Sequence, residues 1–246
     1  MRDIENYEHE YLDNPFEKHM LQFRHACAAK SLKAREARHV LEIGCGLEPS
    51  YKYYDTFESL TIVEPSALFC DEVRSRAPCN VTLINSPFDN KLAQSLNKKF
   101  DAVLLSSLLH EVPDPVGFLE SVAYICNRDT FVHINVPNAL SLHRLLGVTM
   151  GIATTTYDKS ERQVRFQQHN VFDMKSLAAL VNDAGFSIED SGSIFIKPFT
   201  HEQMQALIDI GFLTGQMLEG LNRLVSDLPQ HGSELYMNVR LENGFI

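Results

Sequence analysis

The sequence lacks the features that would place the protein in a membrane or in a secretory pathway. None of its apolar runs approaches the roughly 20 residues that a membrane-crossing helix needs. The N-terminal stretch MRDIENYEHEYLDN is acidic and polar, which is typical of neither a secretory signal nor a transit peptide. The five cysteines form no C-x-x-C pair and no disulfide-like spacing, as in proteins of a reducing compartment. These absences predict a cytoplasmic protein without a membrane partner.

Positive charge is also scarce. The 246-residue chain has 22 lysine and arginine residues against 32 aspartate and glutamate residues, so its formal net charge is −10. A nucleic-acid backbone is bound by a broad basic surface, and this balance therefore argues against nucleic acid as the main partner. The chain also lacks an H-x-x-x-H pair and a cluster of cysteine and histidine, so we expect no metal site.

Short apolar runs alternate with helical stretches from residue 39 onward. Because the runs show no polar alternation, they are typical of strands buried on both faces, and the strand–helix alternation favours a parallel sheet. We therefore predict a doubly wound α/β domain over residues 39–246, preceded by an N-terminal helical cap over residues 1–38. The expected strands are HVLEIG (39–44), LTIVE (60–64), VTLIN (81–85), FDAVLLSS (100–107) and TFVHINVP (130–137).

The C-terminal half departs from this alternation. Residues 139–170 fit neither a strand nor a helix pattern well, and we interpret them as an insertion after the fifth strand, on the substrate side. Two late strands, over residues 186–199 and 234–242, are separated by helix alone, which suits a pair at the sheet edge with one strand antiparallel. The helical stretch 200–228 could pack on the sheet or supply the face of a homodimer, and the sequence leaves both open.

The end of the first expected strand carries a glycine turn. Gly44 and Gly46 let the backbone turn tightly and let a ligand approach its amide groups. A third glycine would complete a G-x-G-x-G pattern, but Glu48 stands in its place and Pro49 follows without an amide donor. With Glu42 before the turn, two carboxylates would repel a pyrophosphate. The pattern favours a ligand with a cationic amino-acid end, such as S-adenosylmethionine, which carries a sulfonium and an ammonium group.

Glu64 ends the second expected strand, twenty residues after Gly44. In a Rossmann-like sheet, a carboxylate at this position accepts the hydroxyl protons of a ribose. Each feature also has a purely structural explanation, because the glycines could form a plain turn and Glu64 could begin a helix. Together, the turn and the carboxylate indicate a nucleoside-binding edge of the sheet.

Four motifs in this order carry a resemblance to a known family. They are VLEIGCG (40–46), IVEP (62–65), FDAVLLSSLLHEVPDP (100–115) and FVHINVPNA (131–139). Through them, the chain from about residue 38 to 137 resembles the class I, Rossmann-like S-adenosylmethionine-dependent methyltransferases. The resemblance implies a mostly parallel seven-stranded sheet with an antiparallel last strand, S-adenosylmethionine as cofactor and S-adenosylhomocysteine as product. Residues 135–147 and 165–186 look like the branch that acts on small molecules or glycan precursors.

The resemblance also implies cofactor contacts at the strand ends. Gly44 and Gly46 would pass under the methionine part of the cofactor, and Glu64 would hold its ribose. Residues 85–88 would lie along the adenine, although the acid that the family often carries there is missing. The implied cofactor-binding residues are Glu42, Gly44, Cys45, Gly46, Glu64, Pro65, Ser86, Pro87, Phe88, Ser106 and Ser107.

Methyl transfer to a hydroxyl group gains from a general base, and three histidines are candidates. His110 follows the fourth strand, His143 opens the insertion, and His169 precedes the next helix. Each also has a structural alternative, such as starting a helix, packing or hydrogen bonding to the backbone. Arg144 could clamp a carboxylate or phosphate of the acceptor through its planar fork, or form a salt bridge on a helix surface.

The sequence thus favours methyl transfer to oxygen or nitrogen of a small-molecule or glycan-type acceptor. A catalytically inactive S-adenosylmethionine-binding partner or sensor protein is the alternative, kept open by Glu48 in the loop and by the missing adenine acid. A nicotinamide dehydrogenase on the same sheet is disfavoured by the carboxylates at the glycine turn.

Overall fold

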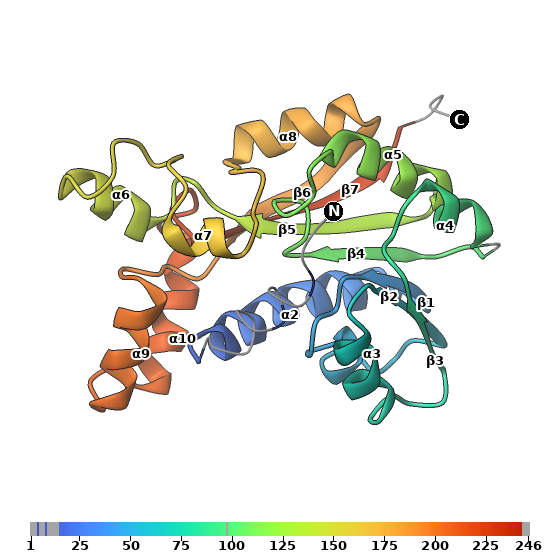
Figure 1. The fold of residues 1–246 in the computed structure, drawn as a ribbon, viewed down its shortest axis with the longest axis horizontal. Coiled ribbons are helices and arrows are strands. Elements are labelled where there is room, and N and C mark those ends of the chain that lie inside the picture. Colours follow the sequence, from blue (N-terminus) through green and yellow to red (C-terminus); the bar gives the residue numbers. More distant parts are fainter. Residues whose placement is uncertain (1–3, 5–7, 9–14, 97, 243–246) are drawn as a thin grey trace.

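The computed structural model describes residues 4, 8, 15–96 and 98–242. Seven strands form one sheet in the order β3-β2-β1-β4-β5-β7-β6 (Figure 1). Only β7 runs against its neighbours, because it lies antiparallel between β5 and β6. The predicted doubly wound, mostly parallel seven-stranded fold is thereby confirmed. The strands are β1 (His39–Ile43), β2 (Ser59–Glu64), β3 (Val81–Asn85), β4 (Ala102–Ser106), β5 (Phe131–Pro137), β6 (Phe186–Ile194) and β7 (Glu234–Leu241).

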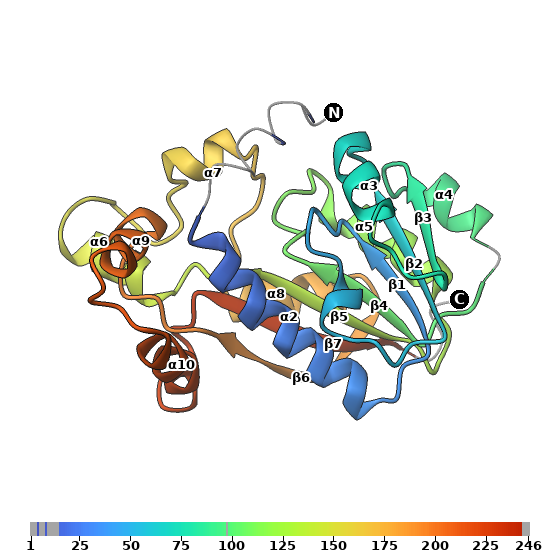
Figure 2. The same cartoon turned by 90° about the horizontal axis from the view of Figure 1, so that it is seen from below.

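Helices cover both faces of the sheet (Figure 2). Successive strand side chains point to opposite faces, so Leu41 and Val103 pack with one set of helices while Val40 and Leu104 pack with the other. The first face carries α4 (Asn90–Ser95), α5 (Pro115–Ile125) and α8 (Met174–Asp183), and the second carries α2 (Glu17–Ala34) and α3 (Ala67–Arg74). No helix in the described part of the chain is both long and apolar enough to span a bilayer.

The helix α2 shares a core with the sheet. Ala29 and Leu32 are buried with Val40, Leu60 and Leu104. The connection from β1 to β2 contains only the short 3-10 turn η1 (Ser50–Lys52). Pro49 precedes η1 in an extended conformation, and a full helix directly after the glycine turn does not form. The space on this face is filled by α2, whose His25 ring stacks on Tyr53 with 4.5 Å between ring centroids.

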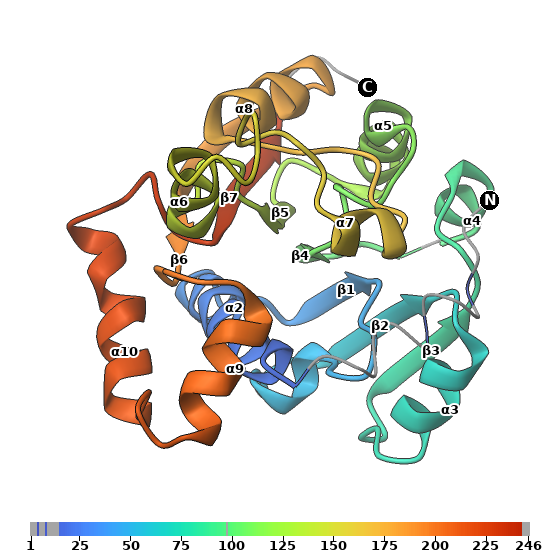
Figure 3. The ribbon, with the colours of Figure 1, turned by 60° about the vertical axis from the view of Figure 1, so that its left-hand side comes forward.

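The segment predicted as an insertion, residues 139–170, leaves the sheet domain and returns to it at neighbouring positions. The Ala139 amide donates to the Phe172 carbonyl at 2.7 Å, and Asn138 forms an isolated bridge with Phe172. Between these anchors lie α6 (Leu142–Thr149) and α7 (Glu161–Arg165). Figure 3 shows both helices beside the ends of β4 and β5. The chain segment predicted as an insertion therefore stands over the carboxyl edge of the sheet.

The helical stretch predicted over residues 200–228 is two helices rather than one. They are α9 (His201–Asp209) and α10 (Gly215–Arg223), followed by the turn η2 (Leu224–Ser226). The break lies at Gly211, whose φ of 72° belongs to the left-handed region that favours glycine. Met204, Leu213 and Leu218 pack against Phe16 and Met20 at the start of α2. The two helices thus extend the wall that α2 forms beside the sheet.

Candidate active site

The carboxyl ends of four neighbouring strands, β2, β1, β4 and β5, open into one cavity. Because parallel strands end at the same edge of the sheet, residues from distant motifs meet there. His110, His143 and Arg144 line the same cavity. Ser86, Pro87, Phe88 and His169 do not border it. The lining residues that were expected at the cofactor are Glu42, Gly44, Cys45, Gly46, Glu64, Pro65, Ser106 and Ser107.

The glycine turn after β1 requires its glycines. Gly44 and Gly46 have φ values of 75° and 57°, in the left-handed region where a side chain is strained. A Cβ atom on Gly44 would stand 3.4 Å from Cδ1 of Leu108. The Gly44 amide donates to the Val63 carbonyl at 2.8 Å, which ties the turn to β2. The turn therefore presents bare backbone to the cavity.

Two buried carboxylates hold this turn. Glu64 accepts hydrogen bonds from the amides of Gly46, at 3.0 Å, and Ser66, at 2.9 Å. Glu42 accepts from the Ser50 amide at 2.9 Å and from the Ser50 hydroxyl at 2.7 Å. The acids both shape the loop and place negative charge beside the cavity.

Glu48 contributes its backbone to the turn, through an amide that donates to the Cys45 carbonyl at 3.4 Å, but its side chain takes no part in this arrangement. Its carboxylate pairs with the Lys52 ammonium at 2.8 Å on the surface, and it does not line the cavity. The expectation that Glu48 adds a negative charge at the ligand is therefore wrong. An i,i+4 pairing across η1 draws the side chain outward. The second carboxylate at the cavity is Glu64, not Glu48.

Burial raises the pKa of Glu42 to about 7, although the Ser50 hydrogen bonds oppose the shift and the charge of Glu64 adds to it. A raised folded-state pKa means that the native protein holds this proton more firmly than the unfolded chain. Ionisation of Glu42 therefore costs stability as pH rises from about 4.5 to 7.

We expect Glu42→Gln to match the wild type in unfolding free energy near the low end of this pH range. At pH 8 we expect the variant to be more stable by up to about 3 kcal/mol. Urea denaturation at both pH values measures the difference, with Glu58→Gln, at an exposed acid before β2, as the control. A gain that does not change with pH would show that ionisation of Glu42 is not its cause.

His110 is almost fully buried at the cavity wall, and its Nε2 lies 3.7 Å from Oε1 of Glu111. The His110 carbonyl accepts from the amides of His169 and Asn170, both at 2.9 Å. The His169 side chain is exposed, so this residue contributes its backbone and not its imidazole. The exposure of His169 and its position outside the cavity lining favour a backbone role over the predicted general base. The two amide hydrogen bonds therefore hold the loop that carries His110 against the end of the insertion.

Arg144 binds within the insertion. Its Nη1 donates to the carbonyls of Thr156, at 2.6 Å, and Asp158, at 3.1 Å, and its Nη2 donates to Gln163. These contacts favour a structural part for Arg144 over the predicted clamp on an acceptor. They tie α6 to α7, and Gln163 in turn borders the cavity.

The β3 end stands apart from the cavity. Phe88 is buried against Phe118, with ring centroids 5.5 Å apart, in the core under α5. The Ser86 hydroxyl donates to the Pro87 carbonyl, and Pro87 is exposed. The predicted adenine contact of Ser86, Pro87 and Phe88 stays a prediction, because the cavity does not reach them.

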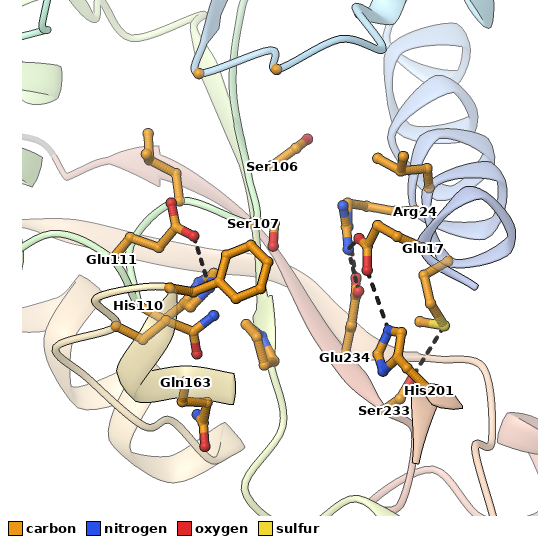
Figure 4. Close-up of a pocket in the computed structure, with 18 of the residues that line it drawn as sticks. Glu17, Arg24, Ser106, Ser107, His110, Glu111, Gln163, His201, Ser233 and Glu234 are labelled. Atoms are coloured by element: carbon orange, nitrogen blue, oxygen red, sulfur yellow. Dashed lines mark hydrogen bonds and ion pairs between the residues drawn. The ribbon is translucent and has the colours of Figure 1, made fainter. Parts of the chain in front are cut away.

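A second charged wall of the cavity was missed by sequence reasoning. Arg24 on α2 donates through Nε to Glu234 at 2.9 Å and through Nη2 to Glu17 at 2.9 Å (Figure 4). His201 on α9 binds Glu17, and Lys197 binds His201. Nη1 of Arg24 makes no hydrogen bond to any described residue, although Arg24 is buried at the cavity. The sequence offered one signal for this wall. Arg24 falls on the same helix face as the apolar residues Leu21 and Ala28, where a charged residue is unusual.

Ser106 brings a hydroxyl group to the cavity from the end of β4. Oγ of Ser106 is buried at the cavity without a hydrogen-bond partner among the described residues. Within the same described part of the chain, no three His, Cys, Asp or Glu side chains gather as a metal site.

Comparisons with known proteins agree with this geometry. The family model described as "Methyltransferase domain" matches residues 11–191. No curated protein sequence matches the chain. The plantazolicin methyltransferase BamL, solved with a triazolic desmethylPZN analog and SAH, is 16% identical with a TM-score of 0.59, over 96% of this chain and 94% of that one.

Two further structures share the fold. The 1,6-didemethyltoxoflavin-N1-methyltransferase of Burkholderia thailandensis is 16% identical with a TM-score of 0.54, over 89% of this chain and 77% of that one. The mitomycin 7-O-methyltransferase MmcR is 13% identical with a TM-score of 0.55, over 89% of this chain and 53% of that one. The family match covers more than half of the sequence. The chain therefore belongs to the methyltransferase domain family, as a class I S-adenosylmethionine-dependent methyltransferase.

Proposed function

We propose that the protein methylates an oxygen or nitrogen atom of a small molecule that binds between His110 and Glu17. The observation that carries this proposal is the continuous cavity that joins the glycine turn to these two residues. Bound S-adenosylmethionine supplies an electrophilic methyl group on its sulfonium. Transfer from such a donor depends chiefly on alignment of the acceptor and exclusion of water, and a buried cavity serves both.

The residues at the glycine turn fit this cofactor. The bare backbone of Gly44 and Gly46 admits a closely packed ligand, and the acids Glu42 and Glu64 favour its cationic groups. We propose that Glu64 accepts hydrogen bonds from the ribose hydroxyls. Arg24 has free donors at Nη1, which suit the carboxylate at the amino-acid end of the cofactor.

On the acceptor side we propose His110 as the general base. A base must reach the proton that it takes, and His110 lines the cavity beside Ser107 (Figure 4). The Glu111 carboxylate, 3.7 Å from His110 Nε2, would stabilise the protonated ring. His143 lines the cavity from the start of α6 and is the second candidate. An amine that arrives neutral would need this help less than a hydroxyl.

The acceptor type is supported in two ways. The structural neighbours include a 1,6-didemethyltoxoflavin-N1-methyltransferase and the mitomycin 7-O-methyltransferase MmcR, and BamL was solved with a desmethylPZN analog. A glycan-type acceptor is supported by the sequence resemblance alone. A cytoplasmic location and a homodimer through α9 and α10 are likewise proposals that rest on the sequence alone.

Calorimetry followed by a turnover screen tests the proposed function. We expect the protein to bind S-adenosylmethionine and S-adenosylhomocysteine and not NAD. Release of S-adenosylhomocysteine that depends on an added small molecule would then support the enzyme. Binding without any acceptor-dependent release across a broad metabolite screen would favour the inactive binding partner.

Glu64→Ala tests the proposed ribose contact. We expect the variant to bind S-adenosylhomocysteine more weakly by roughly 1–3 kcal/mol, because hydrogen bonds to a charged carboxylate are lost. Calorimetry on the wild type and the variant measures this change. Glu58→Ala, which removes an exposed acid just before β2, is the matched control and should leave affinity unchanged. An unaltered affinity in Glu64→Ala would remove Glu64 from the binding site.

A further inference from the structure

Beyond Ser106 and Ser107 the cavity continues between two polar walls, which we call the acceptor chamber. One wall consists of Glu17, Lys197 and His201, from α2 and the segment that leads into α9. The other consists of His110, Glu111 and Gln163, from the loop after β4 and from α7. Figure 4 shows Glu17 and His201 facing His110, Glu111 and Gln163 across the opening. The polar side chains of both walls can therefore reach one bound molecule.

Hydrogen bonds orient the first wall residue by residue. The Lys197 ammonium donates to Nδ1 of His201 at 2.7 Å, so His201 carries its proton on Nε2. This Nε2 donates to Oε2 of Glu17 at 3.2 Å, while Oε1 of Glu17 accepts from Arg24 at 2.9 Å. This chain of hydrogen bonds ends at the carboxylate of Glu17. Glu17 is thereby fixed in place as an ionised group that offers only acceptor positions.

Glu17 is the most exposed side chain of the ion-pair network on the first wall. The Glu17 side chain is 18% exposed and that of Arg24 is 7% exposed, while Lys197 is only 4% exposed. The Arg24 guanidinium is already bound by the carboxylates of Glu17 and Glu234. On the opposite wall, Glu111 adds a further acid. The carboxylates of Glu17 and Glu111 would attract a cationic group of a bound molecule.

Phenylalanine and tyrosine side chains, on which a flat aromatic acceptor could stack, are scarce in the lining of the cavity. Ligand pockets for such molecules are lined mainly by hydrophobic and aromatic side chains. Among the described residues that line this cavity, Phe166 is the single phenylalanine and there is no tyrosine. The polar side chains of the two walls therefore offer more specific contacts to an acceptor than aromatic stacking does.

Resting on the proposed function, we propose that the acceptor is a small polar molecule that carries an amino group, and that Glu17 binds this amino group. The charged ammonium has no lone pair while Glu17 holds it, so the methylated atom is a second group of the same molecule. That second group lies toward His110. Glu17 thus determines specificity, and His110 serves the reacting atom.

Ligand-observed NMR on the protein saturated with S-adenosylhomocysteine tests this proposal. The probes are molecules that share one skeleton, such as glucosamine, glucose and glucose 6-phosphate, together with matched amines, alcohols and phosphates on smaller carbon rings. We expect the amines to bind preferentially and to lose at least tenfold in affinity in Glu17→Gln. Glu219→Gln, at an exposed acid on α10, should change nothing.

The outcomes separate this inference from the proposed function. If S-adenosylhomocysteine fails to bind the wild type, the proposed function itself fails. If it binds, the inference is overturned when alcohols or phosphates bind as well as the amines, when no probe binds, or when Glu17→Gln retains amine binding. Thermal unfolding checks that Glu17→Gln is folded. Should it be unfolded, Glu17→Asp keeps the charge on a shorter side chain, and an unweakened amine affinity there would equally reject the proposal.

Discussion

Arg24→Leu is expected to lower the unfolding free energy by about 3–5 kcal/mol, because it leaves the buried carboxylate of Glu234 and the half-buried carboxylate of Glu17 without their cation. The cost arises from unpaired buried charge and much less from lost packing. Urea denaturation of the variant and the wild type measures the change. Such an effect would be among the largest that a single substitution causes in this fold.

Arg35→Leu is the matched control for this loss. Arg35 lies on the same helix region and pairs with Glu189 at 3.1 Å, but both side chains are partly open to solvent. Its removal should cost about 1 kcal/mol or less. A loss in Arg24→Leu no greater than that in Arg35→Leu would show that the buried pairs contribute nothing special.

Arg24→Lys separates the structural from the binding part of Arg24. It keeps a positive charge between Glu17 and Glu234 while it removes the planar fork and the open Nη1 donors. We expect a smaller stability loss than in Arg24→Leu. Affinity for S-adenosylhomocysteine should fall, while affinity for 5′-methylthioadenosine, which lacks the amino-acid end, should stay the same.

His110→Asn is expected to reduce kcat by roughly 100-fold to 10,000-fold with a hydroxyl acceptor, because the variant lacks a group that can take the proton. Affinity for S-adenosylhomocysteine should be retained, since the glycine turn and Glu64 are untouched. Single-turnover kinetics with the acceptor found in the screen measures the effect. At higher pH the deficit should shrink, because a hydroxyl that ionises by itself needs no base.

His133→Asn controls for the loss of a buried histidine as such. His133 lies in β5, hydrogen-bonded to Asn238 at 2.8 Å, and does not border the cavity. Its replacement should affect stability and leave kcat near the wild-type value. If His110→Asn and His133→Asn slow turnover to the same degree, His110 is not the base.

The sheet and its glycine turn could be predicted because their signals are local. The run VTLIN corresponds to β3 residue for residue, and the strand ends at Glu64 and Ser106 lie at the edge where the predicted site was placed. Apolar runs bounded by turn residues mark buried strands wherever they occur in a chain. Parallel order then brings their carboxyl ends together without further information.

The wall of the site that contains Arg24 and Glu234 could not be predicted, because it depends on contacts between distant segments. Arg24 and Glu234 are separated by 210 positions, and they meet only because β7 enters between β5 and β6 with Glu234 opposite Pro137. A charged residue inside a helical pattern indicates a partner but does not identify it. His169 illustrates a different limit, since the pattern indicated a functional position while the amide, and not the ring, makes the contact.

The hydrogen bonds between the end of the insertion and the loop after β4 have a consequence for how such enzymes could acquire new substrates. The segment between Ala139 and Phe172 is closed by its own base, so another sequence could be exchanged for it without disturbing the strands. Yet the amides of His169 and Asn170 hold the carbonyl of His110. An exchanged segment that omitted these two amides would also lose the hydrogen bonds that position the loop of His110, the proposed general base. Under the proposed function, exchange of the segment is thus tied to catalysis through two backbone groups.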